Sequence, residues 1–294
     1  MAGLTAAKSF WRIQQQDSAM TKLVKLDVYS GRPNPVWTLS DDLSTQLSTQ
    51  TGAAPSDGGQ GLGYRGFKII ESSSDVQQMA TTEDLIGDFS VTSTIFGSAD
   101  LEKSLMQSGV QAGAIDSGLA GYLADCFGSS ASSGSSLTAS GGSCPTCGGA
   151  DAPSYDPGKW NNDPAVQRGN NCYAYANNNP TGTFPQPGRG SGQIFASLDC
   201  DGVRPASEKD GLVTTSTYQA SRAGWYVALV IWPGQDYHWY RQDDGGCWSH
   251  KPGQTPARNT DNSGAAISDP QQCDRGPYTT FCTFMVSSSS VTIS

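Results

Sequence analysis

A stretch rich in glycine and serine divides this chain near its middle. Glycine or serine occupies 14 of the 23 positions from 128 to 150. Such a stretch has little apolar surface to bury, and its composition is typical of a linker. We therefore predict a small α+β domain at residues 1–127, a linker with the motif CPTC at 128–150, and an aromatic-rich domain at 151–294.

The N-terminal segment has the pattern of an α+β unit without a candidate catalytic group. Residues 5–20 could form a helix, and residues 23–30 alternate apolar and charged side chains as a half-buried strand does. Further strands are predicted in GYRGFKIIES and DFSVTSTIFG, and helices in DDLSTQLSTQ, ADLEKSLMQSG and GLAGYLADCF. The segment contains no histidine. Its role is therefore left open.

The C-terminal segment contains the most apolar run of the chain, WYVALVIW at 225–232. The run has no polar alternation, so it predicts a strand buried on both faces. It is too short to span a bilayer, and we expect no membrane insertion. YTTFCTFMV, at 278–286, predicts a further strand. Strands mixed with short helices place the whole chain in the α+β class.

Charge and cysteine content limit which partners and which compartment suit the chain. The net charge of −9 and the pI of about 4.6 disfavour binding to nucleic acid, because like charges repel. Eight cysteines in a chain rich in glycine and serine favour an oxidising, extracellular compartment. The first 20 residues lack the apolar core of a signal peptide. We expect a secreted protein that leaves by a non-classical route or has lost a leader segment.

Both histidines of the chain lie in one predicted hairpin, YHWYRQDDGGCWSHK. A loop of two or four residues within DDGG would place His238 and His250 on opposite faces. A three-residue loop at 244–246 would pair Tyr240 with His250 and place both imidazoles on one face. The glycine pair permits the positive φ that a three-residue loop requires, so we predict that loop.

Cys172 is the candidate nucleophile. Asn170 or Asn171 is a good N-cap, and CYAYA follows as a short helix. A thiol in the first turn of a helix is expected to have a lowered pKa, as a nucleophile needs. Cys172, His238 and His250 would then form a nucleophile, a base and an orienting group. Alternatives are a disulfide at Cys172, structural histidines, or a zinc site that combines both histidines with a cysteine.

The order of these residues resembles the papain-like cysteine hydrolases, in particular cell-wall amidases of the NlpC type. The resemblance covers about residues 170–253. It implies a papain-like domain in which a short cysteine-bearing helix packs on an antiparallel sheet. It also implies Cys172 as nucleophile, His238 as base and His250 as orienting residue. The implied partner is a peptide or protein substrate, including peptidoglycan peptides, with no cofactor and no metal.

Two functions are therefore compared. The first is a cysteine amidase or peptidase that acts through Cys172, His238 and His250. The alternative is a non-enzymatic, disulfide-stabilised secreted protein with a structural, adhesive or self-assembling role. The CPTC motif is interpreted as a small disulfide loop between Cys144 and Cys147. NTDNSG, at 259–264, lacks the full ligand series of a calcium loop and is interpreted as a polar loop.

Overall fold

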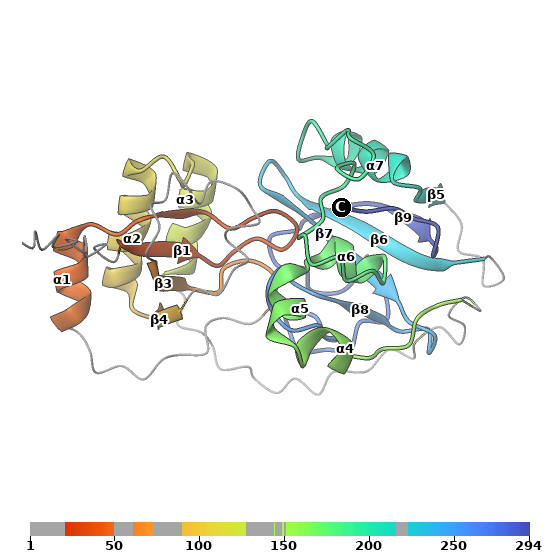
Figure 1. The fold of residues 1–294 in the computed structure, drawn as a ribbon, viewed down its shortest axis with the longest axis horizontal. Coiled ribbons are helices and arrows are strands. Elements are labelled where there is room, and N and C mark those ends of the chain that lie inside the picture. Colours follow the sequence, from red (N-terminus) through yellow and green to blue (C-terminus); the bar gives the residue numbers. More distant parts are fainter. Residues whose placement is uncertain are drawn as a thin grey trace, which may run out of the picture.

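The computed structural model of the chain has a mixed α+β architecture, which confirms the predicted class. It describes residues 21–49, 61–72, 90–127, 144, 149, 151–215 and 223–294. The helix predicted at 5–20 lies outside these residues, as does the predicted linker except for Cys144 and Gly149. Figure 1 shows two lobes, each built on its own antiparallel sheet.

The first sheet has the strand order β2-β1-β3-β4. Its strands are β1 (Thr21–Leu26), β2 (Val36–Thr38), β3 (Phe67–Ser72) and β4 (Ser90–Ile95). Val24 and Leu26 enter the core, as the alternation predicted. Lys25 and Asp27 are also buried, so the prediction of a half-buried strand was wrong for them. Asp27 stays charged there because it forms ion pairs with Arg65 and with Lys68.

Helices α1 (Asp41–Thr49), α2 (Ala99–Gln111) and α3 (Ser117–Cys126) complete the first lobe, close to the predicted positions. The chain enters α3 through Asp116, whose carboxylate accepts a hydrogen bond from the backbone amide of Leu119. Leu105, Leu119 and Leu123 turn their side chains into the core beside the first sheet. The packing of these apolar faces holds the helices on the sheet.

The second sheet has the strand order β5-β9-β6-β7-β8, with every neighbouring pair antiparallel. Its strands are β5 (Val213–Thr215), β6 (Trp225–Trp232), β7 (Asp236–Gln242), β8 (Trp248–His250) and β9 (Thr280–Ser287). Strand β6 is central and buried along its whole length, as its apolar run predicted.

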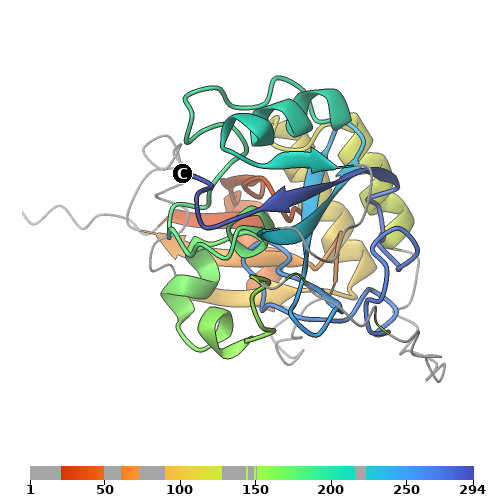
Figure 2. The ribbon, with the colours of Figure 1, turned by 90° about the vertical axis from the view of Figure 1, so that its right-hand side faces the viewer.

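Four helices accompany this sheet: α4 (Gly158–Asn161), α5 (Pro164–Gly169), α6 (Cys172–Ala176) and α7 (Cys200–Lys209). Only α6 was predicted. Figure 2 looks at the molecule from this side and shows α7 alongside β5 and β9. None of the helices in the described part of the chain has the length and apolar character that crossing a membrane requires.

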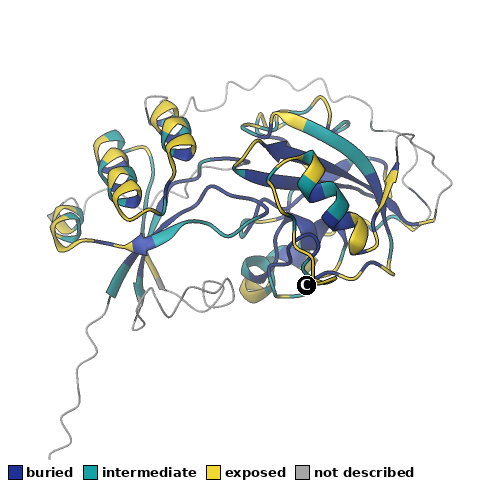
Figure 3. Ribbon diagram, turned by 90° about the horizontal axis from the view of Figure 1, so that it is seen from above, coloured by how far each residue is buried: buried dark blue, intermediate teal, exposed yellow. Residues whose placement is uncertain are grey.

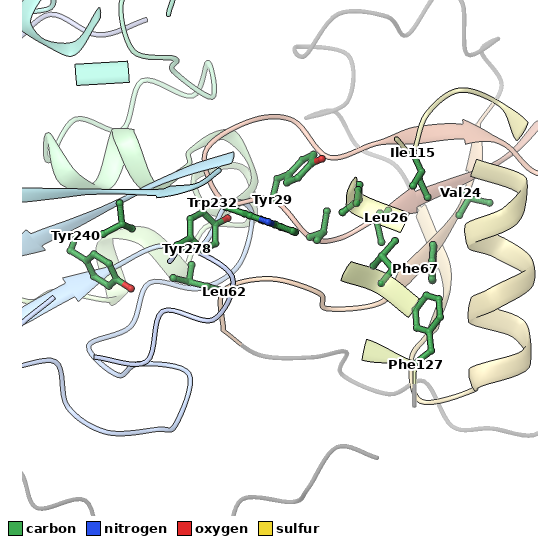
Figure 4. Packing of buried hydrophobic residues seen from close by; sticks show 14 of the residues in the cluster. Val24, Leu26, Tyr29, Leu62, Phe67, Ile115, Phe127, Trp232, Tyr240 and Tyr278 are labelled. Carbon is green, nitrogen blue, oxygen red and sulfur yellow. The ribbon is translucent and has the colours of Figure 1, made fainter. Parts of the chain in front are cut away.

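A single apolar cluster extends from the first sheet to one face of the second. Tyr29 and Leu62 of the first lobe belong to the same cluster as Trp232, Tyr240 and Tyr278 of the second, and Figure 4 shows these side chains in one continuous run. A second cluster fills the opposite face of the second sheet, beneath α6. Figure 3 shows the buried positions concentrated in the strands and in the connections between the lobes.

Two disulfides join distant parts of the described C-terminal segment. Cys144 is bonded to Cys247, and Cys200 is bonded to Cys282. The first bond corrects the prediction that Cys144 closes a small loop with Cys147, because Cys144 lies against the β7–β8 hairpin. Cys147 lies outside the described residues. The described cysteines that stay free are Cys126, Cys172 and Cys273.

Candidate functional site

Cys172 is the first residue of α6, as predicted. The side chain of Asn171 caps this helix by accepting hydrogen bonds from the backbone amides of Tyr173 and Ala174, both over 3.1 Å. Local sequence accounts for this start, since asparagine is among the best N-cap residues. Cys172 is nevertheless fully buried, because α6 packs against β7 within the second apolar cluster.

The β7–β8 hairpin has the predicted register. Tyr240 pairs with His250, and the amide of Asp243 donates to the carbonyl of Cys247 over 2.8 Å. This pairing leaves the three-residue loop 244–246, in which Gly246 has a φ of 83°. Both imidazoles therefore lie on one face, with 2.8 Å between His238 Nε2 and His250 Nδ1.

The contact between His250 and the carbonyl of Thr260 fixes the tautomer of both rings. His250 Nε2 lies 3.0 Å from the carbonyl oxygen of Thr260, which can only accept a hydrogen bond, so Nε2 carries the hydrogen. In the neutral ring His250 Nδ1 must then accept from His238 Nε2. This leaves His238 Nδ1 as an acceptor, and the hydroxyl of Ser30 donates to it in a short hydrogen bond. The hydrogen bonds of both rings are satisfied without a charge.

Ser30 is the residue that the sequence analysis missed. It belongs to the connection between β1 and β2, which enters the second lobe, and its side chain hydrogen-bonds to the sulfur of Cys172 as well as to His238. The other hydrogen-bond partner of the sulfur is the backbone of Trp239. His238 and His250 lie on the face of the second sheet that carries Tyr240, whereas Cys172 belongs to the apolar cluster on the opposite face. Ser30 is the residue that contacts both His238 and Cys172. Ser30 takes the place at the thiol in which a His238 nitrogen was expected.

Burial controls the ionisation of these residues. It raises the pKa of Cys172 well above the usual thiol range, against the lowering that was expected from the helix start. Burial likewise lowers the pKa of His238 well below its ordinary value and that of His250 to about 3. Desolvation exceeds the helix effect here because α6 has only five residues and no water reaches the thiol. The resting site holds a neutral thiol and two neutral imidazoles at pH 7.

The segment that carries Ser30 is held by one buried carboxylate. Asp236 accepts hydrogen bonds from the backbone amides of Ser30, Gly31 and Arg32 over 2.6, 3.1 and 3.0 Å. It also accepts one from the hydroxyl of Tyr278 over 2.5 Å. Burial raises the pKa of Asp236, whereas these four donors stabilise its ionised form and oppose that rise.

The carbonyl oxygen of Gly31 is surrounded by donors of the second lobe. Asn171 Nδ2 lies 2.7 Å away, and Gln186 Nε2 and the Tyr237 hydroxyl lie 3.0 Å away. Gly31 also lies flat on the ring of Tyr237, where an added Cβ would meet a ring carbon at 2.4 Å. Only glycine leaves room for this contact.

Lys251 is a buried cation close to Cys172. Its ammonium donates to the carbonyl oxygens of Gln167, Asn170 and Gly253 over 2.5 to 2.6 Å. Burial lowers the pKa of Lys251 to about 7. Two of these carbonyls lie in or directly after α5, and the third follows β8. Lys251 therefore holds α5 against the segment after β8.

The geometry supports neither a zinc site at the histidines nor a calcium site in the loop 259–264. Across the described ranges, no group of three or more histidine, cysteine, aspartate and glutamate side chains could hold a metal ion. Asp261 in NTDNSG accepts from the amides of Ser263, Ala265 and Asp274, so this loop closes on itself as predicted. Asp243, at the turn of the β7–β8 hairpin, forms a buried ion pair with Arg241 over 2.8 Å.

Comparison with known proteins gives one clear relationship. No protein-family model matches the chain, and no solved structure matches it significantly. Insoluble matrix shell protein 1 of Ruditapes philippinarum is 51% identical to it over 127 residues, which are 43% of this chain and 84% of that protein. The chain belongs to the family of this shell matrix protein. That family membership contradicts the expected description of the chain as a hydrolase of the cysteine peptidase type. The resemblance to NlpC-type amidases is not tested by these comparisons.

Proposed function

We propose that the protein is a non-enzymatic, disulfide-stabilised structural component of an extracellular matrix and that it works by associating with other chains. The observation that carries this proposal is the family relationship to a protein described as an insoluble matrix shell protein. The predicted alternative of a secreted structural or self-assembling protein is therefore preferred to the predicted hydrolase.

The geometry of the cysteine and the histidines supports the same choice. Cys172, His238 and His250 each have 0% of their surface exposed. The hydroxyl of Ser30 hydrogen-bonds to His238 Nδ1, and the nitrogens of His250 are used by His238 and by the carbonyl of Thr260. A hydrolase needs a substrate carbonyl within reach of an ionisable nucleophile. Here the thiol is buried and neutral, and the hydroxyl of Ser30 lies against it.

The disulfides support an extracellular role. They join residues 103 and 82 positions apart in sequence. In the chain-entropy description, a crosslink that closes a loop of this length stabilises the fold by about 4–5 kcal/mol. Such bonds persist in oxidising compartments and not in the cytosol. They would maintain the aromatic lobe during long residence in a matrix.

Fractionation of the extracellular material that contains the protein tests this function. We expect mass spectrometry to find the chain mainly in the fraction that stays insoluble after extraction with salt and chelator. In parallel, the purified protein and its Cys172→Ala variant should hydrolyse a panel of amide and peptide substrates equally slowly. Recovery only from intracellular extracts, or turnover that requires Cys172, would contradict the proposal.

A further inference from the structure

The second lobe contains a site that recognises a peptide backbone. Four backbone groups of the segment 30–32, namely its three amides and the carbonyl of Gly31, bind side chains of the second lobe rather than a neighbouring strand. The residues that bind them are buried and come from the N-terminus of α6, the loop before α7 and the start of β7. They are Asn171, Gln186, Asp236 and Tyr237.

This site is selective for its occupant. The flat contact with Tyr237 requires glycine at the centre of the peptide, because any Cβ would lie 2.4 Å from the ring. The pair of neutral histidines requires a hydroxyl donor before that glycine, which Ser30 supplies. Arg32, the following residue, donates through its side chain to the carbonyl of Gln235 over 2.8 Å. A Ser-Gly-Arg segment with the bent backbone of residues 30–32 satisfies all three requirements.

No disulfide among the described residues ties the segment 30–32 to the lobe that binds it. Both described disulfides lie within the C-terminal segment, between Cys144 and Cys282. The first lobe ends at the buried Phe127, and residues 128–143 alone lead from there to Cys144. Glycine and serine dominate those residues, so sequence does not favour one fixed path. In Figure 1 the β1–β2 connection reaches from the first lobe to the region of β7 and α6.

We infer that this site also accepts the Ser30–Arg32 segment of a second copy of the chain, so that chains are linked by exchange of their first lobes. The inference rests on the proposed matrix function and gives it a mechanism. Exchange reuses contacts that already exist within one chain, which is a low-cost route to association. Two modules joined by a short linker typically meet each other at an effective concentration on the order of 1 mM. We therefore expect exchange between chains to compete with docking within a chain when the protein itself reaches about that concentration.

A Ser30→Cys substitution provides the direct test. The new thiol takes the place of the hydroxyl that touches the sulfur of Cys172, so oxidation links whichever two segments are docked. Isotopically light and heavy chains are mixed under reducing conditions, concentrated from about 10 μM to about 1 mM, oxidised with glutathione disulfide and separated on a denaturing gel. Mass spectrometry then identifies linked peptides that contain positions 30 and 172.

Exchange predicts that linked peptides of mixed isotope appear and that their share rises at least tenfold over this concentration range. The background is set by the same chain with Cys172→Ala, in which Cys126 and Cys273 remain available. Links within single chains only, at every concentration, would overturn the inference. So would the absence of any link between these positions. If such a chain is still recovered in the insoluble fraction, the matrix function stands and exchange alone is wrong.

Complementation gives a second, independent measurement. Gly31→Ala prevents the segment from docking but leaves the site intact. Asp236→Asn weakens the site but leaves the segment intact. Mixed together, the two variants should form a one-to-one complex in sedimentation that neither forms alone. Gly121→Ala is the matched control, because a Cβ at Gly121 meets nothing within 4 Å and should leave sedimentation unchanged. Failure of the two variants to combine would count against exchange.

Discussion

His238 donates its Nε2 proton to Nδ1 of His250 over 2.8 Å, and the carbonyl of Thr260 fixes the direction of that bond. The two rings therefore depend on each other for satisfied hydrogen bonds, since neither is exposed to solvent. A His250→Ala substitution should lower the free energy of unfolding by about 2–4 kcal/mol, since it leaves the His238 donor unpaired and opens a cavity. Denaturant unfolding of the oxidised protein measures this loss. Val110→Ala, at a side chain 45% exposed, should change stability by less than about 0.5 kcal/mol.

The same pair makes stability depend on pH. Both histidines have pKa values in the folded chain below the value of about 6.5 in the unfolded chain. Their contribution is therefore fully present above that pH and is lost as the pH falls, because only the unfolded chain gains the protons. Between pH 7.5 and 5, each histidine should cost the protein about 2 kcal/mol. His250→Gln should remove about half of the combined dependence. An identical pH profile in wild type and variant would contradict this assignment.

Cys172 should be the least reactive of the described free cysteines. Its sulfur is fully buried and the pKa of its thiol is strongly raised, whereas Cys126 and Cys273 are only partly buried. Iodoacetamide at neutral pH should modify Cys126 and Cys273 in the native protein and reach Cys172 only after denaturation. Mass spectrometry of timed samples gives the order. Modification of Cys172 first would mean that the segment over it opens readily.

The buried ion pair between Asp27 and Arg65 should matter far more than an exposed one. Asp27→Asn leaves the Arg65 guanidinium buried without its carboxylate, and loss of one partner of such a pair costs about 3–5 kcal/mol. Glu208→Gln removes the exposed i,i+4 pair with Arg204, which should contribute less than about 0.5 kcal/mol. Parallel denaturant titrations compare the two. Equal losses would show that burial does not decide the strength of these pairs.

Local patterns predicted those parts of the site that depend on neighbouring residues. The N-cap at Asn171 and the three-residue turn with Gly246 follow from local chemistry, and both are confirmed. Ser30 could not be predicted, because 142 positions separate it from Cys172 and no local signal relates the two. The raised pKa of Cys172 was missed for a similar reason, since α6 is buried against β7, more than 60 positions further along the chain.

The pairing of Cys144 depended on tertiary structure in the same way. Its neighbour Cys147 gave a local CxxC motif, whereas the bond in the structure joins Cys144 to Cys247, 103 positions away in the β7–β8 hairpin. Strand β6 was predicted correctly because eight consecutive apolar residues can be buried on both faces only inside a sheet. Sequence therefore indicated the elements of the second lobe better than the contacts that the first lobe makes with it.

The three backbone amides on Asp236 have a mechanical consequence. Because they belong to consecutive residues and share one carboxylate, a force that pulls the lobes apart loads all three bonds at the same time. They should therefore break together and not one after another. The connection should therefore resist tension up to a threshold and then yield in a single step. In a matrix under load, this carboxylate would set the force at which the two lobes separate.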